Sequence, residues 1–235
     1  MVKLLLLEKQ IWEIENTEPA EVVDKEEYKD FLNIESDWGN HILRAMRNLL
    51  TGSKDYPNIT KDDMLNGDGL RVVLWVSGCT HHCPGCQNPT THDFNGGGLV
   101  ELELVKEAID ELEYQTGITF SGGDPMFQLY ACNELAEYCK NKGYNIWVYT
   151  GFTYEELIKL SENKPIYREF LNNIDVLVDG KFIEEEKNLN LLFRGSNNQR
   201  LIDVQATLEK GEIVLLNEYE YHEEKFFEKK VPMFV

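Results

Sequence analysis

The chain has 235 residues, of which 42% are hydrophobic and 11% aromatic, so it can bury a core without disulfides or metals and is not a disordered protein. Its 23 basic and 42 acidic residues give a net charge of −19, which excludes nucleic acid as an expected partner because phosphate backbones would be repelled. Its apolar runs are shorter than the roughly 18 residues of a membrane span, and residues 1–7 are too short for a signal peptide. We therefore expect a cytoplasmic protein without membrane contact.

Residues 1–55 are expected to form an acidic, helical extension of unknown role. Thr17 is a suitable capping residue, and Pro19 suits the first turn of a helix predicted over residues 17–32. A second helix is predicted over residues 36–50. The extension contains no cluster of metal ligands or nucleophiles, so we assign it no part in chemistry.

The main domain is predicted over residues 56–207, with residues 208–235 as a C-terminal tail. Strands are predicted over 70–76, 118–120, 145–149 and 174–178, helices over 100–114, 127–141 and 153–161, and a flexible turn over 95–98. Strands that alternate with helices favour an α/β fold with a mainly parallel sheet and right-handed crossovers. Four such units suggest a partial (β/α) barrel or an open sheet.

Glycine-rich or polar segments follow each of the predicted parallel strands. They are the cysteine-containing stretch 79–86, the Gly-Gly-Asp-Pro turn 122–125, Thr150 with Gly151, and Asp179. Because α/β folds place their chemistry at the carboxyl ends of parallel strands, these segments predict a common site at one edge of the sheet.

Three cysteines directly follow the first predicted strand with the spacing C-x3-C-x2-C: Cys79, Cys83 and Cys86. Three thiolates on one short loop suit either a structural zinc ion or an iron–sulfur cluster. Zinc would take a fourth ligand from one of three nearby histidines: His81, His82 or His92. A four-iron cluster would keep one iron open to an outside ligand. The spacing alone leaves both alternatives open.

The other two cysteines, Cys132 and Cys139, lie seven residues apart in a predicted helix. Seven residues are two helical turns, so we expect both thiols to face the core as small hydrophobic side chains. The odd number of cysteines argues against a disulfide framework.

Five motifs lie in order between residues 56 and 203: NGDGLR at 66–71, VSGCTHHCPGCQNP at 76–89, IWVYTGF at 146–152, LVDGKF at 177–182 and FRGSNNQR at 193–200. Together they resemble the radical S-adenosylmethionine superfamily and, within it, the activating proteins of anaerobic ribonucleoside-triphosphate reductase. Two positions depart from that pattern: Asp68 stands where proline is common, and His92 where tryptophan is usual. Neither is an expected cluster ligand.

The resemblance implies a partial (β/α) barrel of the radical S-adenosylmethionine type, in which Cys79, Cys83 and Cys86 hold a 4Fe-4S cluster. It also implies that S-adenosyl-L-methionine binds the open iron and is cleaved reductively. The resulting 5′-deoxyadenosyl radical would install a glycyl radical on the anaerobic ribonucleoside-triphosphate reductase. A flavodoxin- or ferredoxin-type protein would supply the electron. The cofactor carries the radical, so no catalytic side chain is expected.

The resemblance further implies a set of cofactor-binding residues: Gly85, Cys86, Gln87, Asn88, Gly122, Gly123, Asp124 and Asp179. Three of these assignments have alternatives in the sequence itself. Asn88 could instead cap the loop backbone, the two glycines before Asp124 could form an ordinary turn, and Asp179 could belong to an Asp-Gly turn. His81 and His82 are not expected to be ligands; each should either contact a ligand residue or face solvent.

Three other functions remain open at this point. The chain could activate a different glycyl-radical enzyme, could act on a small molecule with the same cofactors, or could be a non-catalytic zinc or iron–sulfur interaction module.

Overall fold

The computed structural model describes residues 42–45 and 59–219, so the helix predicted over 17–32 lies outside the described residues. The strands are β1 Ile42–Ala45, β2 Ile59–Asp63, β3 Arg71–Val76, β4 Gly98–Glu101, β5 Gly117–Gly122, β6 Asn145–Tyr149, β7 Val176–Asp179 and β8 Arg200–Asp203. The α-helices are α4 Leu102–Asp110, α5 Leu129–Asn141, α6 Tyr154–Asn163, α7 Ile166–Asn173 and α8 Val204–Lys210. Four 3-10 helices are η1 Pro89–Thr91, η2 Pro125–Gln128, η3 Glu184–Glu186 and η4 Asn217–Tyr219.

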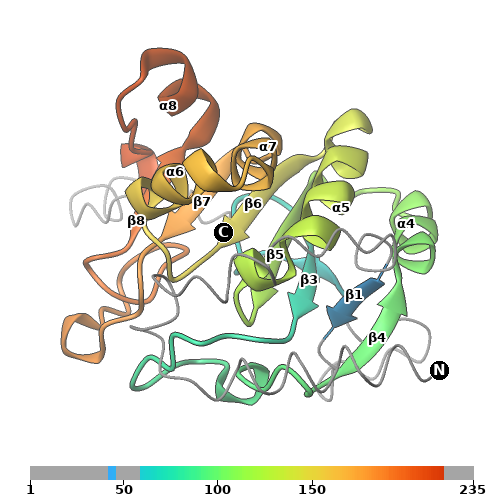
Figure 1. Ribbon diagram of the computed structural model, residues 1–235, viewed down its shortest axis with the longest axis horizontal. Helices are drawn as coiled ribbons and strands as arrows, with labels where there is room; N and C mark the ends of the chain where they lie inside the picture. Colours follow the sequence, from blue (N-terminus) through green and yellow to red (C-terminus); the bar gives the residue numbers. More distant parts are fainter. Residues whose placement is uncertain (1–41, 46–58, 220–235) are drawn as a thin grey trace, which may run out of the picture.

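One mixed sheet organises the described residues, in the order β4-β1-β3-β5-β6-β7-β8, with β2 paired to β3 beside this path (Figure 1). The four central strands β3, β5, β6 and β7 are parallel, and the strands added outside them are antiparallel. The prediction of an α/β fold is therefore confirmed, and the predicted parallel pairing is found in the four central strands of the sheet. In the described part of the chain β4 and β8 end the strand order and do not pair with each other.

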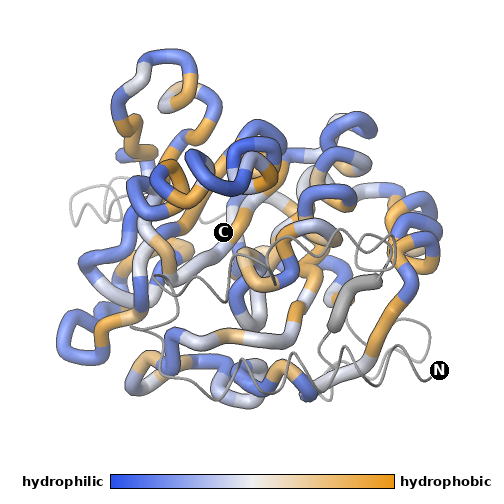
Figure 2. The backbone as a smooth tube through the Cα atoms, in the orientation of Figure 1, coloured by the Kyte–Doolittle hydropathy of each residue, from blue (hydrophilic) through white to orange (hydrophobic). Residues whose placement is uncertain are grey.

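The core lies between this sheet and the helices that cover it. Figure 1 shows α5, α6 and α7 lying side by side over the central strands. Figure 2 shows hydrophobic stretches in the central strands, with hydrophilic residues prominent in the outer turns and loops. Cys132 and Cys139 are both 0% exposed and belong to this core, together with Leu135. The prediction that these two thiols are buried hydrophobic groups is confirmed.

The helix predicted over residues 36–50 is wrong where the structure describes it, because residues 42–45 form the strand β1. This strand pairs along its whole length with β4, from Ile42 opposite Glu101 to Ala45 opposite Gly98. A short apolar run fits a helix and a strand equally well, and pairing with a partner far along the chain decides between them.

The helix predicted over residues 100–114 is also shorter than expected. Gly98–Glu101 forms the strand β4, so the helix α4 begins only at Leu102 and ends at Asp110. Gly98, the last residue of the turn predicted over 95–98, is the first residue of this strand. The first predicted helical positions form a strand instead, because β1 and β4 pair with each other and satisfy each other's backbone hydrogen bonds.

Four further elements were not predicted: β2, β8, α7 and α8. They are short, and their stability comes from packing on neighbours rather than from a long periodic pattern. By contrast, the capping box at the start of α6 is confirmed. The Thr153 side chain accepts from Glu156 N at 3.3 Å, and Glu156 Oε2 accepts from Thr153 N at 2.7 Å.

The predicted division at residue 207 falls inside a helix, since α8 runs from Val204 to Lys210. Asp203 caps this helix by accepting from Ala206 N, and Gly211 ends it in the left-handed conformation. The division into 1–55, 56–207 and 208–235 otherwise stays a prediction.

Candidate functional site

The segments that follow the four parallel strands meet at one edge of the sheet, as the topology requires. The backbone of the 122–124 turn joins β5 to the end of β3: Gly123 N donates to Val76 O at 2.7 Å, and Asp124 N donates to Gly78 O at 2.9 Å. On the next pair of strands, Thr150 N donates to Val178 O at 3.0 Å. The segments that were predicted to share one edge of the sheet are thus joined by backbone hydrogen bonds.

The cluster loop, residues 79–86, carries the three thiols Cys79, Cys83 and Cys86. All three are partly exposed, and none forms a disulfide. Cys86 N donates to Cys83 O at 3.1 Å, which makes the tight turn between the second and third cysteine. Asn88 N donates to Cys86 Sγ at 3.4 Å. A backbone N–H of the chain therefore already points at the sulfur of Cys86.

The thiols influence each other electrostatically. Burial raises the pKa of Cys79 to about 12, and the charges of Asp124, Cys83 and Cys86 add to the rise. Burial also raises the pKa of Cys83, with a smaller opposing effect from a backbone hydrogen bond to Phe182. A bound metal centre would reverse the preference for the thiol form, since a coordinating thiol is deprotonated.

In residues 59–219, no three His, Cys, Asp or Glu side chains are already gathered tightly enough to hold a single metal ion. The donor set nevertheless fits a four-iron cluster by its chemistry. It offers three free thiols on one partly exposed loop and a backbone N–H directed at one of the sulfurs.

The glycines of the 122–124 turn allow it to pack directly on the cluster loop. Gly122 has a φ of +107°, which a residue with a side chain rarely adopts. A Cβ on Gly123 would lie 2.5 Å from Gly78 O, in the residue before Cys79. This close approach is a packing reason for both glycines. Their predicted contact with the methionine end of a cofactor stays a prediction.

Asp124 is 1% exposed, and its carboxylate collects hydrogen bonds from three parts of the site. Thr150 Oγ1 donates to it at 2.9 Å, Gly151 N at 2.9 Å and Met126 N at 2.9 Å. His81 Nε2 lies 2.8 Å from Oδ2. The residue predicted as a cofactor contact is therefore bonded to its own chain, and its contact with a cofactor stays a prediction. No pattern in the sequence pairs Asp124 with His81.

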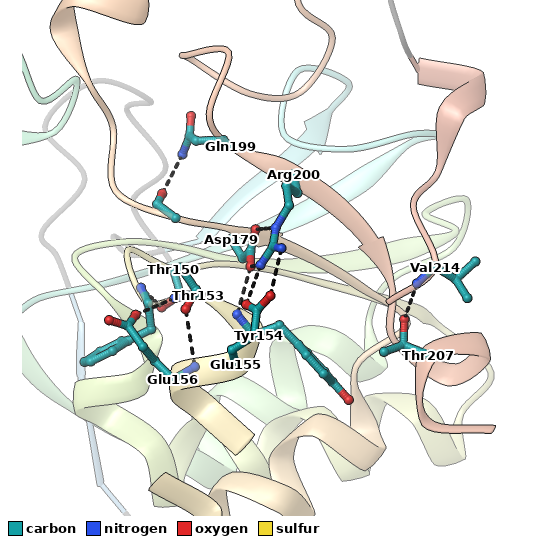
Figure 3. Close-up of polar contacts among 12 residues, drawn as sticks. Thr150, Thr153, Tyr154, Glu155, Glu156, Asp179, Gln199, Arg200, Thr207 and Val214 are labelled. Atoms are coloured by element: carbon teal, nitrogen blue, oxygen red, sulfur yellow. Dashed lines mark hydrogen bonds and ion pairs between the residues drawn. The ribbon is translucent and has the colours of Figure 1, made fainter. Parts of the chain in front are cut away.

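Asp179 is the buried centre of a second network, drawn in Figure 3. It is 1% exposed and accepts from Arg200 Nε at 3.0 Å and from Tyr154 N at 2.8 Å. Arg200 also donates to both carboxylate oxygens of Glu155, at 3.0 and 2.7 Å. These bonds tie β7 and β8 to the first turn of α6. A contact between Asp179 and a cofactor stays a prediction.

The remaining predicted residues lie where the cluster loop meets the segment after β7. A Cβ on Gly85, whose φ is +69°, would lie 2.9 Å from the Glu184 carboxyl carbon, so this glycine permits close packing of the two segments. Gln87 is exposed and approaches Gly195 from the cluster loop. Asn88 precedes η1, but its side chain makes no capping hydrogen bond there. Asn88 therefore does not cap η1, and its contact with a cofactor stays a prediction.

None of the helices in the described ranges is both long and apolar enough to cross a membrane.

A 4Fe-4S single cluster domain matches residues 65–202, which is more than half of the chain. The matched region contains all three cysteines of the cluster loop and both of the acidic networks described above.

Curated relatives also match more than half of the chain. An anaerobic ribonucleoside-triphosphate reductase-activating protein of Haemophilus influenzae is 39% identical over 147 residues, covering 58% of this chain and 90% of that protein. The protein of the same name from Enterobacteria phage T4 is 38% identical over 155 residues, covering 63% and 92%. That of Escherichia coli K12 is 37% identical over 147 residues, covering 58% and 90%.

Proposed function

Because this chain belongs to the family of anaerobic ribonucleoside-triphosphate reductase-activating proteins, we propose that it is an activating enzyme for such a reductase. One observation carries the proposal. Three free thiols with the spacing C-x3-C-x2-C lie on one loop at the carboxyl ends of the parallel strands, inside the matched 4Fe-4S domain.

Cys79, Cys83 and Cys86 would hold the 4Fe-4S cluster through their thiolates. When bound, the cluster and S-adenosyl-L-methionine supply a reductive cleavage whose 5′-deoxyadenosyl radical removes a hydrogen atom from a glycine of the reductase. The chain itself contributes position. The hydrogen bonds from Gly123 and Asp124 to β3 and to Gly78 hold the loop at the edge of the sheet, beside the open ends of β5 and β6.

For S-adenosyl-L-methionine we propose the face formed by the end of the cluster loop and the 122–124 turn. The support is placement. The turn is bonded to Gly78, the residue before the first cluster ligand, and Asn88 follows the last ligand with a side chain that does not cap η1. Backbone carbonyls at a glycine pair can approach an ammonium group closely. Asp179 lies at the end of β7, which is separated from β5 by β6, and would border the same face.

The fold is proposed to be the partial (β/α) barrel of radical S-adenosylmethionine enzymes, and the parallel pairing of β3, β5, β6 and β7 supports this proposal. A flavodoxin- or ferredoxin-type protein is the proposed electron donor. The cytoplasm is the proposed location, which agrees with five cysteines that form no disulfide.

The decisive experiment mixes the anaerobically reduced, cluster-loaded protein with S-adenosyl-L-methionine and the reductase, and records a glycyl radical by electron paramagnetic resonance. The expected result is a radical that requires all three components. Cys83→Ser in the same mixture is the matched control, because it keeps the size of a ligand side chain and removes its thiolate. A cluster-free protein that binds only zinc, or a loaded protein that never forms the radical, would contradict the proposal.

A further inference from the structure

We propose that His81 and Asp124 are a positioning pair that holds the cluster loop against the sheet between its first two cysteines. His81 Nε2 and Asp124 Oδ2 are 2.8 Å apart, and their side chains are 7% and 2% exposed. The effect of this pair on a bound cluster depends on the proposed function, whereas the contact between the two side chains does not.

Asp124 provides a rigid anchor for this contact. Its Oδ1 accepts from Met126 N at 2.9 Å, which fixes the carboxylate on its own turn after β5. Its Oδ2 accepts from Gly151 N at 2.9 Å and from Thr150 Oγ1 at 2.9 Å, which ties it to the end of β6. The carboxylate therefore cannot rotate toward another partner without breaking its hydrogen bonds to the segments that follow β5 and β6. His81 thus contacts an acceptor that is already oriented.

His81 is held in a socket shaped to its ring. The ring packs edge-on against Phe152 with a centroid distance of 4.7 Å, and it lies tilted against Phe127 with a centroid distance of 5.9 Å. A Cβ on Gly151 would lie 2.3 Å from His81 Cδ2, so a glycine is required beside the ring. Because both Asp124 oxygens already accept from other donors, the His81 tautomer that completes the contact is the one whose Nε2–H donates.

Because of the position of His81 in the sequence, its contact with Asp124 also fixes the loop that carries the cysteines. It stands two residues after Cys79 and two before Cys83, and the backbone of Asp124 also holds Gly78, just before Cys79. One residue of the neighbouring turn therefore fixes the cluster loop both ahead of the first thiol and between the first two. His81 performs no chemical step in this scheme. It acts through the cysteines, whose separation and direction it sets.

The first test uses the full-length protein without its cluster, so that it does not depend on the proposed function. Iodoacetamide labelling of each cysteine is followed over time by mass spectrometry in the wild type, His81→Phe and His81→Gln. Phenylalanine keeps the ring in its socket but removes the hydrogen bond, whereas glutamine can place an N–H near the position of Nε2. We expect Cys79 and Cys83 to react about tenfold faster in His81→Phe, since loss of one hydrogen bond to a carboxylate changes a local opening equilibrium by that order.

Cys132 and Cys139, both 0% exposed, report global unfolding in the same measurement and should stay unreactive. His81→Gln should return the rates toward the wild type. If His81→Phe unfolds and exposes these two cysteines, Asp124→Asn replaces it, because the amide keeps the size of the carboxylate and turns one acceptor into a donor. Unchanged labelling of Cys79 and Cys83 in the variant that stays folded, or equal labelling in His81→Gln and His81→Phe, overturns the proposal.

The second test uses the cluster-loaded protein. We expect His81→Phe to alter the electron paramagnetic resonance spectrum of the reduced cluster and His81→Gln to restore it. His82→Asn is the matched control, because His82 is exposed in the same loop with a φ of +44°, which asparagine tolerates. A spectrum altered equally by His82→Asn, or unaltered by His81→Phe, contradicts the proposal. A wild type that assembles no cluster would instead refute the proposed function and leave the labelling result standing.

Discussion

Burial separates the five cysteines into two groups with different roles. Cys79, Cys83 and Cys86 are partly exposed on the cluster loop, whereas Cys132 and Cys139 are fully enclosed by the core. Burial also raises the pKa of Cys139 to about 12, which keeps this thiol protonated and unreactive. The same side chain is therefore the proposed cluster ligand in the loop and a small hydrophobic group in the core.

Removal of one thiol from each group should give opposite results. Cys83→Ala is expected to lose the cluster, since each of the three thiolates would hold one iron. Cys132→Ala is expected to keep it and to lower the free energy of unfolding by about 1 kcal/mol through the small cavity it leaves. Iron and sulfide content, together with urea unfolding, measures both. If Cys83→Ala retained the full cluster, the assignment of Cys83 as a cluster ligand would be wrong.

The contact between the 122–124 turn and the cluster loop predicts a strong effect of one methyl group. Gly123→Ala would place Cβ 2.5 Å from Gly78 O, so the backbone before Cys79 must move. We expect lower iron content and a loss of about 1–3 kcal/mol in the free energy of unfolding, the usual range for overpacking.

Gly98→Ala is the control for this substitution, because within the described part of the chain nothing lies within 4 Å of the added Cβ. It should load iron like the wild type. Equal iron content and equal stability in the two variants would show that the turn does not press on the loop as described.

Among the secondary-structure elements, β7, β8 and α6 are joined by Arg200, which bridges a buried and an exposed carboxylate. Asp179 is 1% exposed, whereas the Glu155 side chain is 58% exposed. Arg200→Leu leaves Asp179 buried without its cation and should lower the free energy of unfolding by about 3 kcal/mol. Glu155→Gln removes only the exposed partner and should cost less than about 1 kcal/mol. Urea unfolding of both variants tests this difference, and equal losses would contradict it.

The junction of α6 and α7 carries a lysine in an aromatic setting. Lys164 Nζ lies 5.0 Å from the Tyr130 ring centroid and 6.0 Å from that of Tyr167. Burial lowers the pKa of Lys164 from 10.5 to about 8. The folded state thus binds fewer protons than the unfolded state between these values, so the penalty of burying the charge is complete below pH 8 and disappears as the pH rises toward 10.5.

Lys164→Met should therefore stabilise the protein below pH 8, with a gain that shrinks between pH 8 and 10.5. Urea unfolding of the wild type and the variant at both ends of this range gives the difference, in which the titration of cysteines and tyrosines cancels. A gain that stays constant or grows with pH would have the wrong sign for a buried lysine.

For the molecule as a whole, the strand β1 makes part of the N-terminal extension a member of the sheet. In the described residues β4 pairs only with β1, and β4 follows directly on the segment that contains the cluster loop. A chain that begins at residue 53 would leave β4 as an unpaired strand. We expect it to show faster hydrogen exchange over residues 98–101 and a lower unfolding midpoint than a chain that begins at residue 36. Identical exchange in the two would show that β1 does not support the sheet.

Local patterns in the sequence were sufficient for the central strands, the helices α5 and α6, the burial of Cys132 and Cys139, and the position of the cluster loop. Each depends on residues that are close in the chain, such as the apolar run of β3 or the capping box of Thr153 and Glu156. The strands β1, β2, β4 and β8 could not be predicted in the same way. They have four or five residues each and exist because a distant strand supplies their hydrogen bonds.

The sequence by itself determined which thiols lie together and that they follow a strand, because three ligands within eight residues need no folding to be neighbours. Only the tertiary structure decided what surrounds them. His81 and Asp124 are 43 positions apart, and Asp179 and Arg200 are 21 positions apart. Parallel strands bring His81 and Asp124 to the same edge of the sheet, and antiparallel pairing of β7 with β8 places Arg200 opposite Asp179. Neither pairing leaves a periodic trace in the sequence, so the partner of a buried carboxylate is known only once the chain is folded.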